Sequence, residues 1–429
     1  MGALSLRISA VFIAATLHLV IFSSITQAAP TTVSSGATAS STAYNNGRKI
    51  VKDSAGNLYV AYTKGATTQI YVSKSTDNGG TWNDMGGAPI QNIAGYVQNY
   101  PAIAVDQSNN LHVVWMGTDA SSGGYNRIKY SKYNGSSWSA YSNIDGVAGN
   151  YSQIRPAIAV DGANNLHVVW AGSDSVETTN TQIKYSKYIS GWSGWINISV
   201  VSGYTQTSPS IAIDSSNYPH VAWMGTDAGN ISYDQIKYSK YNGASWTAWT
   251  NIATIASPNE QSYPQIAIDG SNIPHVVWNG QDGSSGTCSA NPCYQIKYSR
   301  YSGSWSAWIN VKTISNYNQW DPTIVIDNTG RLIVIWSGTD GSYPTYDQIK
   351  YSYCTTTCTN SGNWAAYVNK TSSGSNYQQY PAARWSRYWP NGGDLMWAWC
   401  DGTTVTFDKD GTYQLPGGAS ERGYVDTSW

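Results

Sequence analysis

Short apolar runs separated by polar turns fill almost the whole chain, and the same set of runs returns every 53 to 58 residues. Each set contains a run ending in Ala/Val-x-Asp, a run of the type Leu-His-Val-Val-Trp, a Gln-Ile-Lys-Tyr-Ser-Lys-Tyr run and a short segment around Trp-Ser-Ala-Trp. Runs of this length, rich in β-branched and aromatic residues and bounded by Gly, Asn and Ser, predict strands. A unit of four strands cannot bury both of its faces alone, so we expect the units to stack around a common axis.

Two anchors define the register of the repeat. The Asp that closes the first run recurs as Asp53, Asp106, Asp161, Asp214, Asp269 and Asp327. The Gln-x-x-Pro that opens this run recurs at Gln98, Gln153, Gln206, Gln261, Gln319 and Gln378. A seventh, degraded copy is expected at residues 381–385, 395–400 and 405–407, with a short fourth strand at 412–415. We therefore predict an all-β fold, a seven-bladed β-propeller of four-stranded antiparallel blades at residues 45–416, with six blades as the alternative.

Alternation within the second strand predicts that both faces of each blade are buried. Leu111, Val113 and Trp115 have to point into one layer between blades, while His112 and Val114 point into the next. The same strand position carries a large aromatic residue in five units, and such residues suit the wedge-shaped gap between twisted sheets. These residues are Trp115, Trp170, Trp223, Trp278 and Trp336.

The ends of the chain differ from the repeat. Residues 1–29 combine Arg7, an apolar stretch and a small-residue exit, which predicts a secretory signal peptide cleaved near Ala28 or Ala29. His18 interrupts the apolar stretch, which is too short for a membrane-spanning helix. Residues 30–44 form a Ser/Thr-rich N-terminal segment and residues 417–429 a C-terminal tail. We expect a secreted, extracellular protein that is not inserted in a membrane after cleavage.

Charge and cysteine content narrow the possible partners. The net charge is −1 and only 11% of residues are charged, which argues against nucleic acid and against an electrostatic membrane tether. In an exported protein, Cys288 with Cys293 and Cys354 with Cys358 are candidates for two local disulfides. Cys400 is left over and is expected to be a buried thiol. We expect no metal site and no cofactor, since the cysteines and histidines lack ligand spacing.

One segment carries a specific motif. Ser75, Asp77, Gly79, Thr81 and Trp82 match the Ser-x-Asp-x-Gly-x-Thr-Trp pattern. This segment resembles the Asp-box of the sialidase superfamily and of related propellers with bacterial-neuraminidase repeats. In a tight hairpin the carboxylate can accept backbone N–H groups and the glycine can adopt a positive φ. The resemblance implies a β-propeller whose boxes lie on the face opposite the functional mouth.

Later copies of the box, at residues 131–138 and 239–246, carry Tyr133 and Tyr241 in place of the aspartate. We expect the same hairpin there, stabilised by ring packing. The resemblance also implies what an active sialidase would need, namely three arginines for the substrate carboxylate, a tyrosine paired with a glutamate, and an acidic aspartate. Eight arginines follow the signal peptide, but their places in the repeat do not give the three arginines that would bind a substrate carboxylate. We therefore assign no catalytic residues. Asp321, Tyr263 and Glu260 are the fallback candidates.

Histidines and a second set of aspartates recur with the repeat. A side chain shared by several blades is more simply explained as packing and hydrogen bonding than as a catalytic group. The histidines are His112, His167, His220 and His275. Asp119, Asp174, Asp227, Asp282 and Asp340 end the Trp-x-Gly-x-Asp segments and are expected to cap the loop that follows.

The residue before each repeated proline breaks the repetition. These residues are Tyr100, Arg155, Ser208, Tyr263, Asp321 and Tyr380. Innermost strands of a propeller begin at the mouth of the central channel, so the six side chains should surround one opening, backed by the constant glutamines. With Trp320 as a stacking platform, they could bind sugar faces and hydroxyls. The alternative is that they only plug the channel. The long loops 283–294 and 341–347 open on the same side.

Together these features predict a secreted, lectin-like propeller that recognises glycans or a glycosylated cell surface at its loop-rich mouth. A second hypothesis is a sialidase-like exo-glycosidase or a polysaccharide lyase, with Arg155, Glu260, Tyr263 and Asp321 as residues to test. A third is an adhesive propeller that binds protein, because a propeller fold does not determine function. A monomer is expected.

Overall fold

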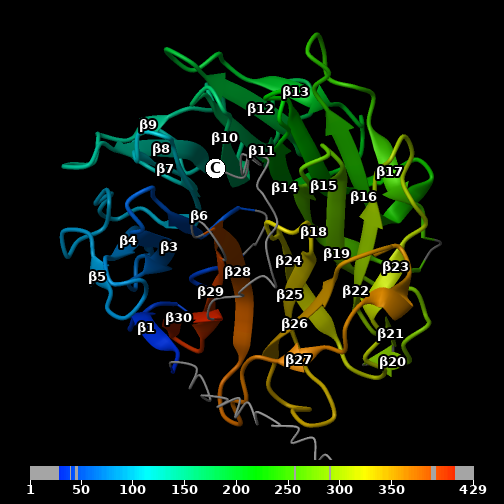
Figure 1. The fold of residues 1–429 in the computed structure, drawn as a ribbon. Helices are drawn as coiled ribbons and strands as arrows, with labels where there is room; N and C mark the ends of the chain where they lie inside the picture. The colour runs from blue at the N-terminus through cyan, green and yellow to red at the C-terminus, as the bar shows by residue number, and fades with distance from the viewer. Residues whose placement is uncertain are drawn as a thin grey trace, which may run out of the picture.

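The computed structural model describes residues 29–38, 40–43, 47–255, 258–288, 291–387 and 393–410. Within these residues, seven four-stranded antiparallel sheets follow one another around a ring (Figure 1). This confirms the seven-bladed propeller and excludes the six-bladed alternative. The predicted signal peptide, apart from Ala29, and the C-terminal tail lie outside the described residues. In the part of the chain that is described, no helix is long and apolar enough to cross a bilayer.

The first four blades follow the repeat directly. Blade 1 contains β2 (Ile50–Lys52), β3 (Leu58–Lys64), β4 (Gln69–Ser75) and β5 (Asn83–Asp84). Blade 2 contains β6 (Gln98–Val105), β7 (Leu111–Gly117), β8 (Arg127–Tyr133) and β9 (Ser142–Asn143). Blade 3 contains β10 (Gln153–Val160), β11 (Leu166–Gly172), β12 (Gln182–Tyr188) and β13 (Ile196–Ser199). Blade 4 contains β14 (Gln206–Ile213), β15 (Pro219–Asp227), β16 (Asn230–Lys240) and β17 (Thr250–Ala253).

Blades 5 and 6 carry additions to the same plan. Blade 5 contains β18 (Gln261–Ile268), β19 (Pro274–Gly280), β22 (Gln295–Arg300) and β23 (Ile309–Lys312), with the small hairpin of β20 (Thr287–Cys288) and β21 (Asn291–Pro292) in its long loop. Blade 6 contains β24 (Gln319–Ile326), β25 (Leu332–Gly338), β26 (Gln348–Cys354), the short 3₁₀-helix η1 (Ser361–Asn363) and β27 (Val368–Asn369). Both predicted disulfides, Cys288–Cys293 and Cys354–Cys358, are present, and Cys400 is a buried free thiol as expected.

Blade 7 is built from both ends of the chain. It contains β28 (Gln378–Arg387), β29 (Gly393–Asp401), β30 (Thr404–Asp410) and, as its outer strand, β1 (Thr31–Ser34). Thr31 lies opposite Phe407 in an antiparallel pair. The expected fourth strand at 412–415 lies outside the described residues, and the N-terminal segment that we expected outside the propeller supplies this strand. The pairing covers a sheet edge that would otherwise be open and joins the last blade to the first.

The core consists of layers between blades, as the alternation predicted. Leu111, Val113 and Trp115 share one buried cluster with blade 1, whereas Val114 belongs to the cluster shared with blade 3. The indole N–H of Trp115 donates to Gln98 Oε1 at 2.8 Å. Five further blades repeat this bond at Trp170, Trp223, Trp278, Trp336 and Trp399. The constant glutamines therefore accept hydrogen bonds from buried indole N–H groups, which need an acceptor, a role that we did not predict.

Two further side-chain clusters recur inside the blades. His112 lies between Asp106 Oδ2 at 3.2 Å and the Tyr130 hydroxyl at 2.9 Å, and burial lowers the pKa of its imidazole. His167, His220 and His275 repeat this arrangement. These contacts support the prediction that the histidines serve packing and hydrogen bonding.

The second cluster explains the other repeated aspartates. Asp119 accepts the backbone N–H of Ser121 with one carboxylate oxygen, which is the loop cap that we expected. Its other oxygen accepts from the ammonium of Lys129, which also donates to Asn143 Oδ1 at 2.8 Å. The same lysine–aspartate pair occurs in five blades with both side chains buried. These charged groups therefore neutralise each other inside the blades.

The Asp-box forms the hairpin that its sequence predicts. Asp77 accepts the Thr81 backbone N–H at 2.8 Å, the Thr81 hydroxyl at 2.7 Å and the Ser75 hydroxyl at 2.7 Å. Gly79 has a φ of +92°. In the decayed copies, Tyr133 packs against Trp138 with 5.3 Å between ring centroids, and the pair at 241 and 246 does the same at 6.1 Å. Ring packing therefore replaces the carboxylate, as expected.

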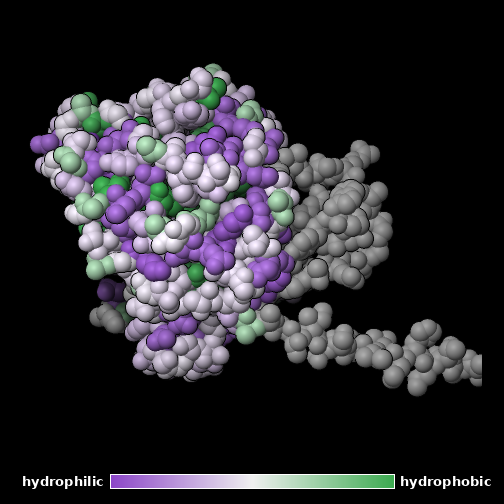
Figure 2. All heavy atoms as spheres, turned by 90° about the vertical axis from the view of Figure 1, so that its left-hand side faces the viewer, coloured by the Kyte–Doolittle hydropathy of each residue, from purple (hydrophilic) through white to green (hydrophobic). Residues whose placement is uncertain are grey.

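The surface is hydrophilic on the side shown in Figure 2, where apolar residues appear as scattered spots rather than as one large patch. Apolar residues scattered singly are normal on a protein surface and mark no interaction site by themselves.

Candidate functional site at the propeller mouth

The strand pairing defines two opposite faces of the ring. Gln98, which begins β6, pairs with Gly117 at the end of β7, and Gly117 pairs with Arg127 at the start of β8. The other ends of these strands meet at Leu111, opposite Tyr133, where the decayed box hairpin follows. The first strands therefore begin on one face, which we call the mouth, and the box hairpins lie on the opposite face, as the family resemblance implied.

A backbone bulge marks every pre-proline position. The β6–β7 ladder shifts register between Asn99 and Ala102, which leaves Tyr100 and Pro101 outside the regular pairing. All six pre-proline residues have φ values between 51° and 55°, although none is glycine. This conformation costs about 1–2 kcal/mol for a residue with a Cβ, and a bulge changes the direction of the side chain. Every repeat therefore keeps a backbone conformation of unfavourable energy at the pre-proline position, which is also the position where the side chain differs from repeat to repeat. Five of the six side chains are partly exposed and Ser208 is buried.

The central channel is a separate feature from the mouth. A cavity of about 290 Å³ is lined by the residues that follow the prolines, from Ala157, Gln265 and Thr323 to the turns at Gly270 and Gly330. None of the pre-proline residues lines it. The cavity therefore extends toward the box face, and the variable residues lie at the opposite end of the same strands.

Two carboxyl groups meet where blades 4 and 5 adjoin at the mouth. The Asp234 backbone N–H donates to Glu260 Oε2 at 3.1 Å, and the Ser262 hydroxyl donates to Glu260 Oε1 at 3.4 Å. Burial raises the pKa of Glu260 to about 7, and the neighbouring Asp234 carboxylate contributes to this rise. Burial raises the pKa of Asp234 as well. We call these two residues the carboxyl pair; the pKa of each lies above the ordinary value for a carboxyl group.

Aromatic and cationic side chains surround the carboxyl pair. The rings of Tyr294 and Trp320 lie 4.3 Å apart between centroids with 36° between their planes, and both side chains are partly exposed. Arg155 donates to Thr207 Oγ1 and Ser208 Oγ, both at 3.0 Å, and its charge opposes the rise in the Asp234 pKa.

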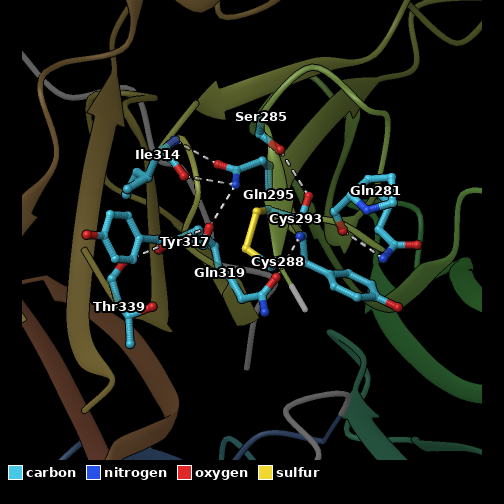
Figure 3. The surroundings of a disulfide bond; sticks show 12 residues. Gln281, Ser285, Cys288, Cys293, Gln295, Ile314, Tyr317, Gln319 and Thr339 are labelled. Atoms are coloured by element: carbon cyan, nitrogen blue, oxygen red, sulfur yellow. Dashed lines mark hydrogen bonds between the residues drawn. A yellow bond between two sulfur atoms is a disulfide. The ribbon is translucent and has the colours of Figure 1, made fainter. Parts of the chain in front are cut away.

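The Cys288–Cys293 loop forms hydrogen bonds with its surroundings (Figure 3). Ser285 donates to the Cys293 carbonyl at 3.1 Å, and Gln281 Nε2 donates to the Pro292 carbonyl at 2.8 Å. Gln281 Oε1 in turn accepts the Glu260 backbone N–H at 3.2 Å. The disulfide loop thus fixes the backbone of Glu260. It also fixes the backbone that carries the Tyr294 ring, because Tyr294 directly follows Cys293.

A second pair of carboxyl groups lies in blade 6. Burial raises the pKa of Asp321 to about 7, and the nearby Asp347 carboxylate adds to the effect. Burial also raises the pKa of Asp347, whose Oδ2 accepts from Gln379 Nε2 of blade 7 at 2.7 Å. Asp321 lies at the pre-proline bulge of β24 and its side chain is partly exposed.

The structure brings some of the predicted site residues together and leaves others apart. Arg155, Glu260, Tyr263 and Trp320 come together beside blades 3 to 6, as the charges acting on Asp234 and Tyr294 show. Asp321 belongs to the second pair of carboxyl groups. Tyr100 and Tyr380 occupy the equivalent bulges in blades 2 and 7.

Sequence reasoning missed Asp234, Tyr294 and Asp347. Each stands directly before the repeated Gln-Ile-Lys-Tyr segment, where the repeats also differ. The same search for variable positions inside a constant repeat would have found them, since third strands begin on the mouth face as well.

Arginines do not converge on the mouth in the described part of the chain. Arg48 and Arg384 line the channel cavity, Arg331 binds Asp327 on the box face, and Arg127 donates to carbonyls of its own blade. Four carboxyl groups accompany Arg155 in the two mouth clusters. Over the described ranges, no group of three or more His, Cys, Asp or Glu side chains is arranged to hold a metal ion.

The fold is a seven-bladed propeller of four-stranded antiparallel blades, which is the architecture that the Asp-box resemblance implied. No protein-family model and no curated protein sequence matches the chain. Among solved structures, a polysaccharide lyase of family PL25, an ulvan lyase bound to an oligosaccharide, matches with a TM-score of 0.61 and 9% identity over 88% of this chain and 95% of that one.

Two arabinan-acting enzymes also match. The GH93 α-L-arabinofuranosidase of Fusarium graminearum with arabinobiose has a TM-score of 0.51 and 11% identity over 73% of this chain and 92% of its own. An α-L-arabinanase of Penicillium chrysogenum with arabinobiose has a TM-score of 0.50 and 11% identity over 73% and 93%. At these identities the likeness concerns the fold alone.

Proposed function

We propose that the protein is a secreted carbohydrate-binding propeller that takes a glycan at the mouth between blades 3 and 6. The observation that carries this proposal is the partly exposed Tyr294–Trp320 ring pair beside the carboxyl pair and Arg155. Apolar sugar faces stack on aromatic rings, while carboxyl and guanidinium groups hydrogen-bond to sugar hydroxyls. The carbohydrate complexes among the structural neighbours and the two disulfides, which suit an oxidising compartment, agree with it.

The charge of the mouth favours a neutral glycan over an acidic one. Four carboxyl groups at Asp234, Glu260, Asp321 and Asp347 would repel a sugar carboxylate once they ionise, and Arg155 offsets a single charge. A sialidase-like clamp of three arginines has no counterpart among the arginines of the described ranges. The sialidase alternative is therefore the weaker one.

A glycan array tests this function. We expect Trp320→Ala to weaken binding of neutral oligosaccharides by about tenfold, because a lost aromatic contact of about 1.4 kcal/mol corresponds to that factor. Tyr353→Ala is the matched control, since that ring is also exposed but lies near the end of β26 toward the box face. Blank binding to every glycan, or equal affinity of the Trp320 variant and the unaltered protein, would contradict the proposal and favour a protein ligand.

A further inference from the structure

We propose that the mouth also hydrolyses the glycan that it binds, with the carboxyl pair Asp234–Glu260 as the proton donor to the glycosidic oxygen. This inference rests on the proposed function, because the pair can act only on a glycan held beside it. It adds a chemical reaction to the proposed function, because a site that only stacks on sugars and hydrogen-bonds to them would be a lectin.

The geometry of the pair is that of a shared-proton site. Asp234 belongs to β16 of blade 4, and Glu260 precedes β18 of blade 5, so the junction of two blades brings the two groups together. Two carboxyl groups in contact cannot both ionise easily, and one of them keeps a proton. The charged or titratable groups that face the pair are Arg155, Lys237 and two phenols. The Lys237 ammonium is bound to Asp227.

The Tyr294 phenol stays protonated at neutral pH, because burial, reinforced by the nearby carboxyl groups, raises its pKa to about 12. Tyr263 lies in the same group and acts on the Tyr294 phenol. The carboxyl pair is therefore the group in this part of the mouth that can give up a proton near pH 7.

Two observations independent of the acidic residues point to a ligand. The first is the partly exposed ring pair of Tyr294 and Trp320, which offers a sugar platform next to Glu260. The second is Asn279, which is 0% exposed and whose two amide atoms have no hydrogen-bond partner among the described residues. Asn279 lies directly across the β18–β19 ladder from Ser262, which donates to Glu260.

The direction of the Asn279 side chain follows from the repeat. The equivalent residue of blade 4, Met224, contacts the next blade, where its sulfur accepts the Tyr263 backbone N–H at 3.3 Å. Asn279 accordingly points from blade 5 toward blade 6, since β19 packs against β24. A buried amide without hydrogen-bond partners lowers the stability of the fold by about 1–3 kcal/mol. We infer that the Asn279 amide is present to hydrogen-bond to a bound molecule.

The reaction balances with the groups present and one water molecule. The proton of the pair passes to the glycosidic oxygen while the bond from that oxygen to the anomeric carbon breaks. Water then forms the new bond to the anomeric carbon, and its released proton returns to the doubly charged pair, directly or through solvent water. The pair ends in its original state. The two carboxylates stabilise the positive charge that develops on the sugar ring, and Arg155, a positioning residue, limits the charge built up when the proton leaves.

The experiment uses the full-length secreted protein and an oligosaccharide panel of arabinan, xylan, cellulose, chitin and ulvan fragments. Each fragment that binds is incubated in ¹⁸O-water, and the products are analysed by mass spectrometry. We expect cleavage that places one ¹⁸O at the new reducing end, with kcat falling above pH of about 7. Glu260→Gln should lower kcat by about 10²–10⁴-fold and leave KM nearly unchanged. Glu177→Gln is the matched control, on a blade 3 loop away from the pair.

A second variant separates chemistry from folding. Asp234→Asn removes the charge that raises the Glu260 pKa, so the alkaline limb of the kcat profile should move to lower pH, a change that a merely structural role would not produce. A bound fragment recovered intact overturns the hydrolase inference and leaves the binding function standing, whereas absence of binding to the whole panel overturns both. Unsaturated products without ¹⁸O would show elimination and would also overturn it. If Glu260→Gln does not fold, the pH shift of the Asp234 variant decides.

Discussion

The contact that closes the ring can be tested at Gly79. A Cβ built on this glycine would lie 2.1 Å from Cε1 of Phe407, and its three nearest atoms all belong to that ring. Phe407 is 2% exposed and packs edge-on against Trp82 with 5.0 Å between centroids, so it has little room to move. Gly79→Ala should cost about 1–3 kcal/mol from overpacking. The positive φ adds about 1–2 kcal/mol.

Gly86 provides the matched control, because it has a φ of +87° and a Cβ added to it would meet nothing within 4 Å. Gly86→Ala therefore carries the backbone strain without the clash. Urea unfolding followed by tryptophan fluorescence compares the two variants, and equal slopes allow their midpoints to be read as stabilities. We expect Gly79→Ala to be less stable than Gly86→Ala by about 1–3 kcal/mol. Equal midpoints would refute the described packing of the box hairpin on blade 7.

Two further predictions concern buried and hydrogen-bonded charge. Lys237→Met should destabilise the protein by about 3–5 kcal/mol, because it leaves the Asp227 carboxylate buried without its ammonium partner. Adding Asp227→Asn to the Lys237→Met variant should restore part of the lost stability. Thermal unfolding measures the stability of both variants. Bonds from Thr81 hold the pKa of Asp77 at about 2. Because this is below the ordinary value, Asp77 stabilises the fold above about pH 4 and loses that effect as the pH falls through 2. Asp77→Asn should therefore be less stable than the unaltered protein at pH 7 and equal to it near pH 2, and an unchanged gap at both pH values would contradict this assignment.

The strands and their order were predictable because each repeat carries its own period and its own turn residues. Leu111 to Trp115 alternates between two buried layers in the sequence as it does in the fold. The two disulfides were predictable because their cysteines are close in the chain. Blade 7 was not, because its outer strand comes from Thr31–Ser34, and local sequence carries no sign of a pairing between residues almost four hundred positions apart.

The candidate site divides in the same way. Variation before each proline indicated where chemistry would gather, and the structure adds that these residues sit on bulges with positive φ. The partner of Glu260 was not predictable, because Asp234 belongs to a different blade and meets it through one backbone hydrogen bond. The bond from the Trp115 indole to Gln98 was not predictable either, since only packing brings the two side chains together.

The sequence by itself determined the repeat, its four strands and the hairpin of the Asp-box, because these depend on short-range periodicity and turn chemistry, whereas the structure decided between seven and six blades. Only the tertiary structure decided how the ring closes and which side chains of different blades face each other. Such contacts depend on the radial stacking of sheets, which brings together residues that no local pattern connects. The pairing of Asp234 with Glu260 arises from that stacking.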